Sequence, residues 1–326
     1  MNILVIGGAG YIGSHMVKLL GRMGCEVTTL DNLSSGHRDA VLFGAFVEGD
    51  LADRALLAKL LQSGCYDAVM HFASFIQVGE SVKDPAKYYE NNVSNTLNLL
   101  NAMRTADVKR FIFSSTAATF GAPQYTPIDE VHPQDPINPY GRSKLMIEQV
   151  LEDYDRAYGL KSVCLRYFNA AGADPEGELG ERHDPETHLI PLVLQAASGR
   201  RPHISVFGRD YDTSDGTCIR DYVHVADLAA AHSLAVDYLL DGGERAAFNL
   251  GNGLGFSVQQ VIDTARAVTG RQINALDAPR RAGDPPRLVA DASKAMQVLG
   301  WRPAFASLEQ IVRHAWQWEL QYPWER

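Results

Sequence analysis

Tyr140 and Lys144 are four residues apart, so on a helix their side chains lie on the same face. A free phenol has a pKa of about 10 and is a poor base near neutral pH. A nearby ammonium favours the phenolate and brings the phenol into a working range. Ser114, Ser115 and Thr116 form the end of an expected strand, where a hydroxyl can hold a substrate oxygen while a proton moves. Tyr140, Lys144 and Thr116 thus predict acid–base chemistry on a hydroxyl group.

A glycine-rich loop at the start of the chain predicts a dinucleotide site. The apolar run 3–6 leads into a Gly-x-Gly-x-x-Gly spacing from Gly8 to Gly13. Such a loop turns tightly and lets a pyrophosphate approach the N–H groups of a helix N-terminus. The residues expected to bind the cofactor here are Gly7, Gly10, Tyr11, Ile12 and Gly13.

An acidic residue, Asp31, ends the second expected strand, eighteen positions after Gly13. A carboxylate there accepts hydrogen bonds from the adenosine ribose and repels a 2′-phosphate, so NAD is preferred over NADP. Alternatively, the glycines could only form a tight turn. The expected strand before the loop, the expected helix after it and Asp31 all favour the dinucleotide interpretation instead. Together with the Tyr/Lys pair, the loop predicts redox chemistry on a bound nicotinamide.

Composition restricts the class of protein. The 326 residues contain 30 Lys and Arg against 39 Asp and Glu, and we expect no nucleic-acid partner. No apolar run approaches the ~18 residues of a membrane span, so we expect no membrane partner, and we expect no leader segment before the first strand. The scattered cysteines favour reduced thiols and a cytoplasmic protein.

In the first half of the chain, short apolar runs alternate with amphipathic stretches. This pattern is typical of a parallel sheet wrapped by helices. We expect helices from residue 13, over 52–62, over 85–106 and from Pro139, which Asn138 caps. The predicted fold is α/β, a Rossmann-type doubly wound parallel sheet with a smaller mixed α/β substrate domain. The predicted domains are 1–169 and 170–326, with part of 221–250 packing on the first. The predicted strands are 2–6, 26–30, 45–48, 68–71, 110–114 and 162–166.

The polar stretch 173–188 carries His183, Glu186 and His188, which invite a metal interpretation. Irregular loops of this composition are usually solvated, and the sequence offers no further evident ligands. We therefore expect a surface loop and no metal site.

Several segments resemble the extended short-chain dehydrogenase/reductase family, and within it the enzymes that epimerise UDP-hexoses at C4. They are the glycine loop, 114–116, Tyr140 with Lys144, 166–172, 215–224 and 281–284, so the resemblance covers essentially the whole chain. It implies NAD-dependent transient oxidation at C4, rotation of the 4-keto sugar and return of the hydride, which interconverts UDP-galactose and UDP-glucose. It also implies a homodimer through the helices near 85–106 and 139–158.

The resemblance also assigns individual residues. Thr116, Phe120 and Ile76 stand where members of the family carry Ser, Tyr and Lys. The further cofactor-binding residues are Asn32, Asp50, Leu51, Phe72, Ala73, Asn91, Ser114, Tyr140, Lys144 and Tyr167. The substrate-binding residues are Thr116, Tyr140, Asn169, Leu189, Phe207, Arg220, Arg281, Asp284 and Leu288.

Alternative functions remain on the same fold. Leu288 is smaller than the Tyr that borders the sugar in some members, so UDP-N-acetylhexosamines are candidate substrates too, as is the chemistry of a related nucleotide-sugar-modifying enzyme. A 4,6-dehydratase needs an acid and a base after Thr116, where Ala117 and Ala118 stand. A non-catalytic NAD sensor would be expected to lack Tyr140 or Lys144.

Overall fold

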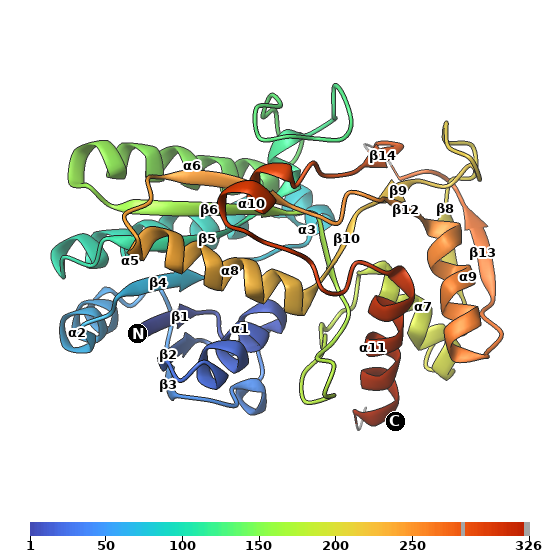
Figure 1. The fold of residues 1–326 in the computed structure, drawn as a ribbon. Coiled ribbons are helices and arrows are strands. Elements are labelled where there is room, and N and C mark those ends of the chain that lie inside the picture. The colour runs from blue at the N-terminus through green and yellow to red at the C-terminus, as the bar shows by residue number, and fades with distance from the viewer. Residues whose placement is uncertain (282–283, 323–326) are drawn as a thin grey trace.

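A seven-stranded parallel sheet forms the centre of the computed structural model, which describes residues 1–281 and 284–322 (Figure 1). Its strands are β1 (Asn2–Ile6), β2 (Glu26–Asp31), β3 (Ala45–Glu48), β4 (Ala68–His71), β5 (Arg110–Thr116), β6 (Lys161–Tyr167) and β11 (Ala246–Leu250). Their order is β11-β6-β5-β4-β1-β2-β3, and all neighbours run parallel. The order reverses between β1 and β4, where doubly wound sheets bind ligands. The Rossmann-type sheet that the sequence predicts is thereby confirmed.

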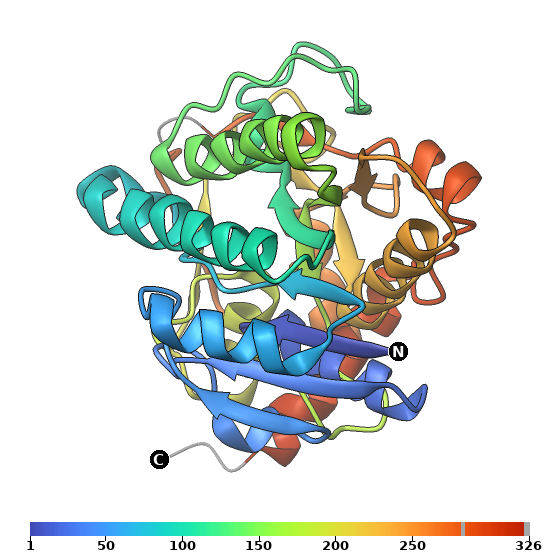
Figure 2. The same cartoon turned by 90° about the vertical axis from the view of Figure 1, so that its left-hand side faces the viewer.

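Helices cover both faces of this sheet (Figure 2). Leu4 and Ile6 belong to the core under α2 (Arg54–Gly64), α5 (Asn95–Thr105) and α6 (Pro139–Tyr158). Ile3 and Val5 belong to the core under α1 (Tyr11–Arg22) and α8 (Val225–Leu240). Because successive side chains of a strand point to opposite faces, a strand buried on both sides needs the continuous apolar run seen in 3–6.

Two segments differ in detail from the expected elements. The helix expected over 85–106 is α4 (Pro85–Tyr89), the π-helical turn η2 (Glu90–Ser94) and α5. The seventh strand, β11, comes from the second half of the chain and pairs with β6, while α8 packs against α1. The division at residue 169 stays a prediction, since 225–250 contributes to the first sheet.

The helix expected from Pro139 is confirmed as α6. The Gly141 N–H donates to Asn138 Oδ1 at 2.8 Å, so Asn138 is the N-cap, and Pro139 occupies the first turn, where its missing N–H costs nothing. This cap fixes the start of the helix that carries the Tyr/Lys pair.

A smaller lobe of mixed sheets and helices lies beyond the carboxyl edge of the main sheet (Figure 1). Its core includes Val193, Ile262 and Ile311. None of the helices that the structure describes is long and apolar enough to cross a membrane. The lobe contains α7 (Leu189–Ser198), β8 (Ile204–Phe207), β9 (Ile219–Arg220), β12 (Phe256–Ser257), α9 (Val258–Thr269), β13 (Ala275–Ala278), β14 (Arg287–Leu288) and α11 (Leu308–Gln321). The remaining elements are η1 (Arg38–Ala40), α3 (Val78–Lys83), η3 (Ala117–Phe120), α10 (Ser293–Val298), and the paired β7 (Asn169–Ala171) and β10 (Tyr222–His224).

Candidate active site

The glycine loop forms a close-packed cradle between β1 and α1. Gly7 has a positive φ of 78°, and a Cβ there would lie 2.5 Å from the Ala73 nitrogen. A Cβ on Gly13 would overlap the Gly7 carbonyl. Gly10 precedes α1 and has no side chain to cap it, so the N–H groups of the first turn are available to an anion. The residues present therefore fit the pyrophosphate of a dinucleotide.

Asp31 lies at the end of β2, beside this cradle. Its Oδ2 accepts from the Ala9 N–H at 2.9 Å and its Oδ1 from the Leu33 N–H at 2.8 Å. Burial raises the pKa of Asp31, and these two hydrogen bonds oppose the rise. Each carboxylate oxygen keeps a further lone pair for a ribose hydroxyl.

The neighbouring expected residues divide into polar and core positions. Asn32 Nδ2 donates to Asp50 Oδ2 at 2.6 Å, which joins the ends of β2 and β3. Leu51 is buried in the core under α2, at 6% exposure, so its side chain serves packing there. The Phe72 ring lies 4.8 Å from the His232 ring, and Ala73 backs the glycine cradle.

Tyr140 and Lys144 are buried in the first two turns of α6. Lys144 Nζ donates to Ser74 Oγ at 2.7 Å and to the Ser114 carbonyl at 2.8 Å, and burial lowers its pKa to about 7. Burial raises the pKa of Tyr140, while a hydrogen bond with the Thr116 side chain lowers it. The structure thus brings the phenol, the ammonium and the Thr116 hydroxyl to one end of β5.

The strand end beside them is polar as well. Ser114 Oγ hydrogen-bonds to the Tyr167 hydroxyl, and the parallel register of β5 and β6 sets Thr116 opposite Tyr167. Burial raises the pKa of Tyr167, so its phenol stays neutral. Five of the expected residues therefore lie together: Ser114, Thr116, Tyr140, Lys144 and Tyr167.

Asn92, which sequence reasoning missed, connects the loop after β4 to α6. Its Oδ1 accepts from the Phe75 N–H at 2.9 Å, and its Nδ2 donates to the Phe75 carbonyl at 3.0 Å and to Ser143 Oγ at 3.2 Å. It lies in the π-helical turn, a feature frequent at functional sites. The neighbouring Asn91, which was expected to bind cofactor, donates to Asn92 Oδ1 at 2.9 Å.

Glu148 is a second missed residue, one turn beyond Lys144 on α6. It accepts from Ser115 Oγ at 2.5 Å and forms an almost fully buried ion pair with Arg166 at 2.6 Å. Its negative charge raises the pKa of Lys144 against the effect of burial. The spacing from Lys144 was the available signal, because i and i+4 residues share a helix face.

The expected substrate residues form two groups in the smaller lobe. Arg220 Nη2 lies 3.2 Å from Asp284 Oδ1, and Leu288 pairs with Arg220 across β14 and β9. The Arg281 guanidinium lies over the Phe207 ring, 4.0 Å from its centroid.

Two further expected substrate residues lie elsewhere. Asn169 Nδ2 donates to the Asp221 carbonyl at 3.1 Å, where β7 meets β10. Leu189 starts α7 and packs on the core of the smaller lobe.

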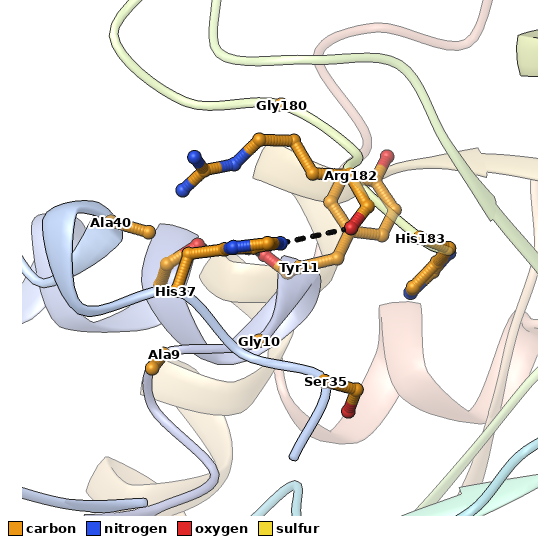
Figure 3. Close-up of a pocket in the computed structure, with 10 residues that line it drawn as sticks. Ala9, Gly10, Tyr11, Ser35, His37, Ala40, Gly180, Arg182 and His183 are labelled. Carbon is orange, nitrogen blue, oxygen red and sulfur yellow. Dashed lines mark hydrogen bonds between the residues drawn. The ribbon is translucent and has the colours of Figure 1, made fainter. Parts of the chain in front are cut away.

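The stretch 173–188 folds over the N-terminus of α1 instead of extending into solvent. Arg182 pairs with Asp39 at 2.9 Å, and the Arg182 carbonyl lies 3.0 Å from His37 Nε2, beside Tyr11 and Gly10 in a small recess (Figure 3). The expectation of a solvated loop is wrong for Glu181, His183 and Glu186, whose side chains are largely buried, whereas the His188 side chain is 41% exposed. The ligand atoms of all four side chains converge. Sequence reasoning left Glu181 out of the group, and the burial of this loop depends on tertiary contacts.

Comparison with known proteins identifies the family. The model of the NAD dependent epimerase/dehydratase family matches residues 3–251. A UDP-glucose 4-epimerase of Halalkalibacterium halodurans is 54% identical over 99% of this chain and 97% of its own. The UDP-glucose 4-epimerase of Brucella ovis, solved with NAD, is 52% identical over 97% of both chains with a TM-score of 0.95. The UDP-Glc/GlcNAc 4-epimerase of Campylobacter jejuni is 46% identical over 98% of this chain and 99% of its own, with a TM-score of 0.87. The chain therefore belongs to the NAD dependent epimerase/dehydratase family.

Proposed function

We infer that the protein interconverts UDP-galactose and UDP-glucose, as an isomerase with NAD as its catalytic cofactor. The observation that carries this inference is the convergence of Tyr140, Lys144 and Thr116 at the carboxyl end of β5, beside the strand-order reversal next to the glycine cradle. The high identity to UDP-glucose 4-epimerases over almost the whole chain supports it.

The cofactor is held by the ends of β1, β2 and β4. Gly7, Gly10 and the first turn of α1 cradle the pyrophosphate, and Asp31 accepts from the adenosine ribose. Lys144 and Tyr167 lie at the opposite end of the site, near β5. Bound NAD supplies the hydride acceptor, and later the hydride donor, for the sugar carbon.

The protein's own residues move the proton and hold the sugar. Tyr140, as phenolate, takes the proton from the sugar 4-hydroxyl, and the Thr116 hydroxyl holds that oxygen. The protonated Lys144 stabilises the phenolate through its positive charge. The 4-keto sugar then turns about its pyrophosphate link and presents the other face of C4 to the returning hydride, while its O4 recovers the proton from Tyr140. The configuration at C4 is thereby inverted.

The UDP group binds in the smaller lobe. Arg220 and Arg281 supply positive charge for the phosphates, since a guanidinium donates paired hydrogen bonds to phosphate oxygens. Asp284 orients Arg220, and Phe207 forms an apolar wall for the uracil ring. Asn169, at the start of β7, and Leu189, at the start of α7, are the further residues that we assign to substrate binding.

The proposal also covers the oligomeric state and the cellular compartment of the protein. The protein forms a homodimer through the helical segments 85–106 and 139–158, where the partly exposed Met146 and Tyr158 leave apolar surface. It works in the cytoplasm, which its free cysteines suit.

The direct test incubates the purified protein with UDP-galactose without added NAD. We expect UDP-glucose to form, because tightly held NAD is regenerated in each cycle. Tyr140→Phe should abolish nearly all turnover while NAD and UDP affinities stay roughly unchanged. An absence of product even with NAD added would contradict the proposed function, and near-normal turnover by Tyr140→Phe would remove Tyr140 from its role.

A further inference from the structure

Four side chains of the segment 181–188 direct their ligand atoms toward one point. One atom each from Glu181, His183, Glu186 and His188 lies within 4.8 Å of the others. Glu181 Oε1 lies 2.9 Å from His183 Nδ1 and 2.5 Å from His188 Nδ1. The Glu186 carboxylate oxygens lie 3.9 Å and 3.6 Å from the same two nitrogens.

These side chains are held in place by the surrounding structure. The Glu181 and Glu186 side chains are only 5% and 6% exposed. The Glu181 carbonyl accepts from Trp318 Nε1 at 3.2 Å, and Glu186 Oε1 accepts from the His188 N–H at 2.8 Å. Glu186 Oε2 faces His183 Nδ1 at 3.9 Å, and Oε1 lies 3.6 Å from His188 Nδ1. A preorganised set of donors of this kind is what a metal site requires.

We propose that Glu181, His183, Glu186 and His188 form a binding site for a divalent transition-metal ion, with Zn²⁺ as the first choice. Two imidazole nitrogens and two carboxylate oxygens are typical Zn²⁺ ligands, and Zn²⁺ bonds of about 2.0–2.2 Å place tetrahedral ligand atoms about 3.4 Å apart. The separations of 2.5–3.9 Å between the histidine nitrogens and the carboxylate oxygens bracket that value. Mg²⁺ and Ca²⁺ prefer all-oxygen shells, so imidazole selects against them.

The position of the site suggests its role. The His183 ring lies edge-on to the Tyr11 ring at 6.1 Å, and Tyr11 is the first residue of α1 (Figure 3). The Tyr11 hydroxyl donates to the Gly172 carbonyl at 2.7 Å, and His188 directly precedes α7. A bound ion would thus fasten the smaller lobe to the helix that begins at the glycine cradle. The role is structural, outside the proton transfer at Tyr140.

Zinc binding tests the proposal on the full-length protein after treatment with EDTA. The Cys65→Ser variant serves as the parent, because Cys65 is an exposed free thiol that can bind zinc itself. Calorimetry with Zn²⁺ should show about one ion per chain, and Mg²⁺ should give no saturable binding. The thermal midpoint should rise with Zn²⁺, since a ligand of the folded state stabilises it.

Variants locate the ion. His183→Ala and, separately, Glu186→Gln should weaken zinc binding at least about 10-fold, whereas His203→Ala, outside the cluster, should leave it unchanged. The proposal is overturned if the Cys65→Ser protein does not bind zinc at about one ion per chain. This outcome can be measured even if the variants of the ligand residues fail to fold. The proposal is equally overturned if zinc binds the His183→Ala and Glu186→Gln proteins as tightly as the parent.

Discussion

At the scale of single residues, burial acts on Tyr140 and Lys144 in ways that oppose their ionised forms. It raises the pKa of the phenol and lowers the pKa of the ammonium to about 7. The hydrogen bond with Thr116 lowers the pKa of Tyr140, and the charge of Glu148 raises the pKa of Lys144. In the proposed mechanism, the positive charge of the bound nicotinamide ring would favour the Tyr140 phenolate further. We therefore expect Tyr140 to act as a base once the cofactor is bound.

We propose that Asp31 sets the choice between NAD and NADP. Asp31→Asn removes the charge that repels a 2′-phosphate but keeps one acceptor oxygen for the Ala9 or Leu33 amide. We expect the preference for NAD over NADP to narrow by at least about tenfold, mostly through tighter NADP binding. Calorimetry on the cofactor-free protein measures this, with Glu48→Gln, an exposed charge at the end of β3, as the control. Equal affinities for the two cofactors in the unmodified protein would refute the role of Asp31.

At the scale of elements, β14 places Leu288 against η3 and opposite Arg220 of β9. Leu288 packs against the cluster of Ala117, Phe120 and Ile128, next to the strand end that carries Thr116. We propose that the side chain at this position limits the room available to the sugar. Steric exclusion by bulk can be added with one substitution.

Leu288→Tyr should therefore suppress activity on UDP-N-acetylglucosamine and spare activity on UDP-glucose. Rates on both sugars give the comparison, and Leu288→Met, which keeps the volume, is the matched control. If the unmodified protein has no activity on the acetylated sugar, or Leu288→Tyr leaves the ratio unchanged, Leu288 does not limit the pocket.

The elements also show what sequence can predict. The strands β1 to β6 were predicted to within two residues, because apolar runs between helices are local signals. The strand β11 was missed as a member of the main sheet, because pairing of Phe248 with Leu165 is a long-range contact. The π-helical turn that interrupts 85–106 could not be predicted, because the spacing of apolar residues in this segment gives no signal for it.

In the candidate site too, local sequence signals could be predicted and long-range contacts could not. The glycine cradle, Asp31, Tyr140 and Lys144 could be predicted because their spacing is itself the signal. Asn92 and Glu181 could not, because their contacts, to the Phe75 backbone and to two histidines, exist only after folding.

At the scale of the whole molecule, buried imidazoles make stability depend on pH. Burial lowers the pKa values of a group of histidines to about 3 or 4, below the usual 6.5: His15, His71, His224 and His232. Below pH 6.5 the unfolded chain takes up protons at these positions and the folded protein does not. Their contribution is therefore present above about pH 6.5 and is lost as the pH falls toward the folded-state pKa values of about 3 or 4, by up to about 1.4 kcal/mol per pH unit for each histidine.

Urea unfolding at about pH 7 and about pH 5 checks this dependence. His232→Gln should reduce the loss of unfolding free energy between the two conditions, because one buried imidazole is gone. His203→Gln, outside the group, should lose as much as the unmodified protein. A loss in His232→Gln as large as in the unmodified protein would show that the buried imidazoles do not govern acid sensitivity.

In the proposed mechanism, the C4 hydrogen leaves as hydride and returns to the same carbon within one site. The measurement is conversion of UDP-galactose that carries deuterium at C4, in ordinary water, followed by mass and NMR analysis of the UDP-glucose formed. Retention of essentially all the deuterium at C4 is the predicted result, because the hydride stays with the bound cofactor and does not exchange with solvent. Replacement of the deuterium by solvent hydrogen would contradict the account.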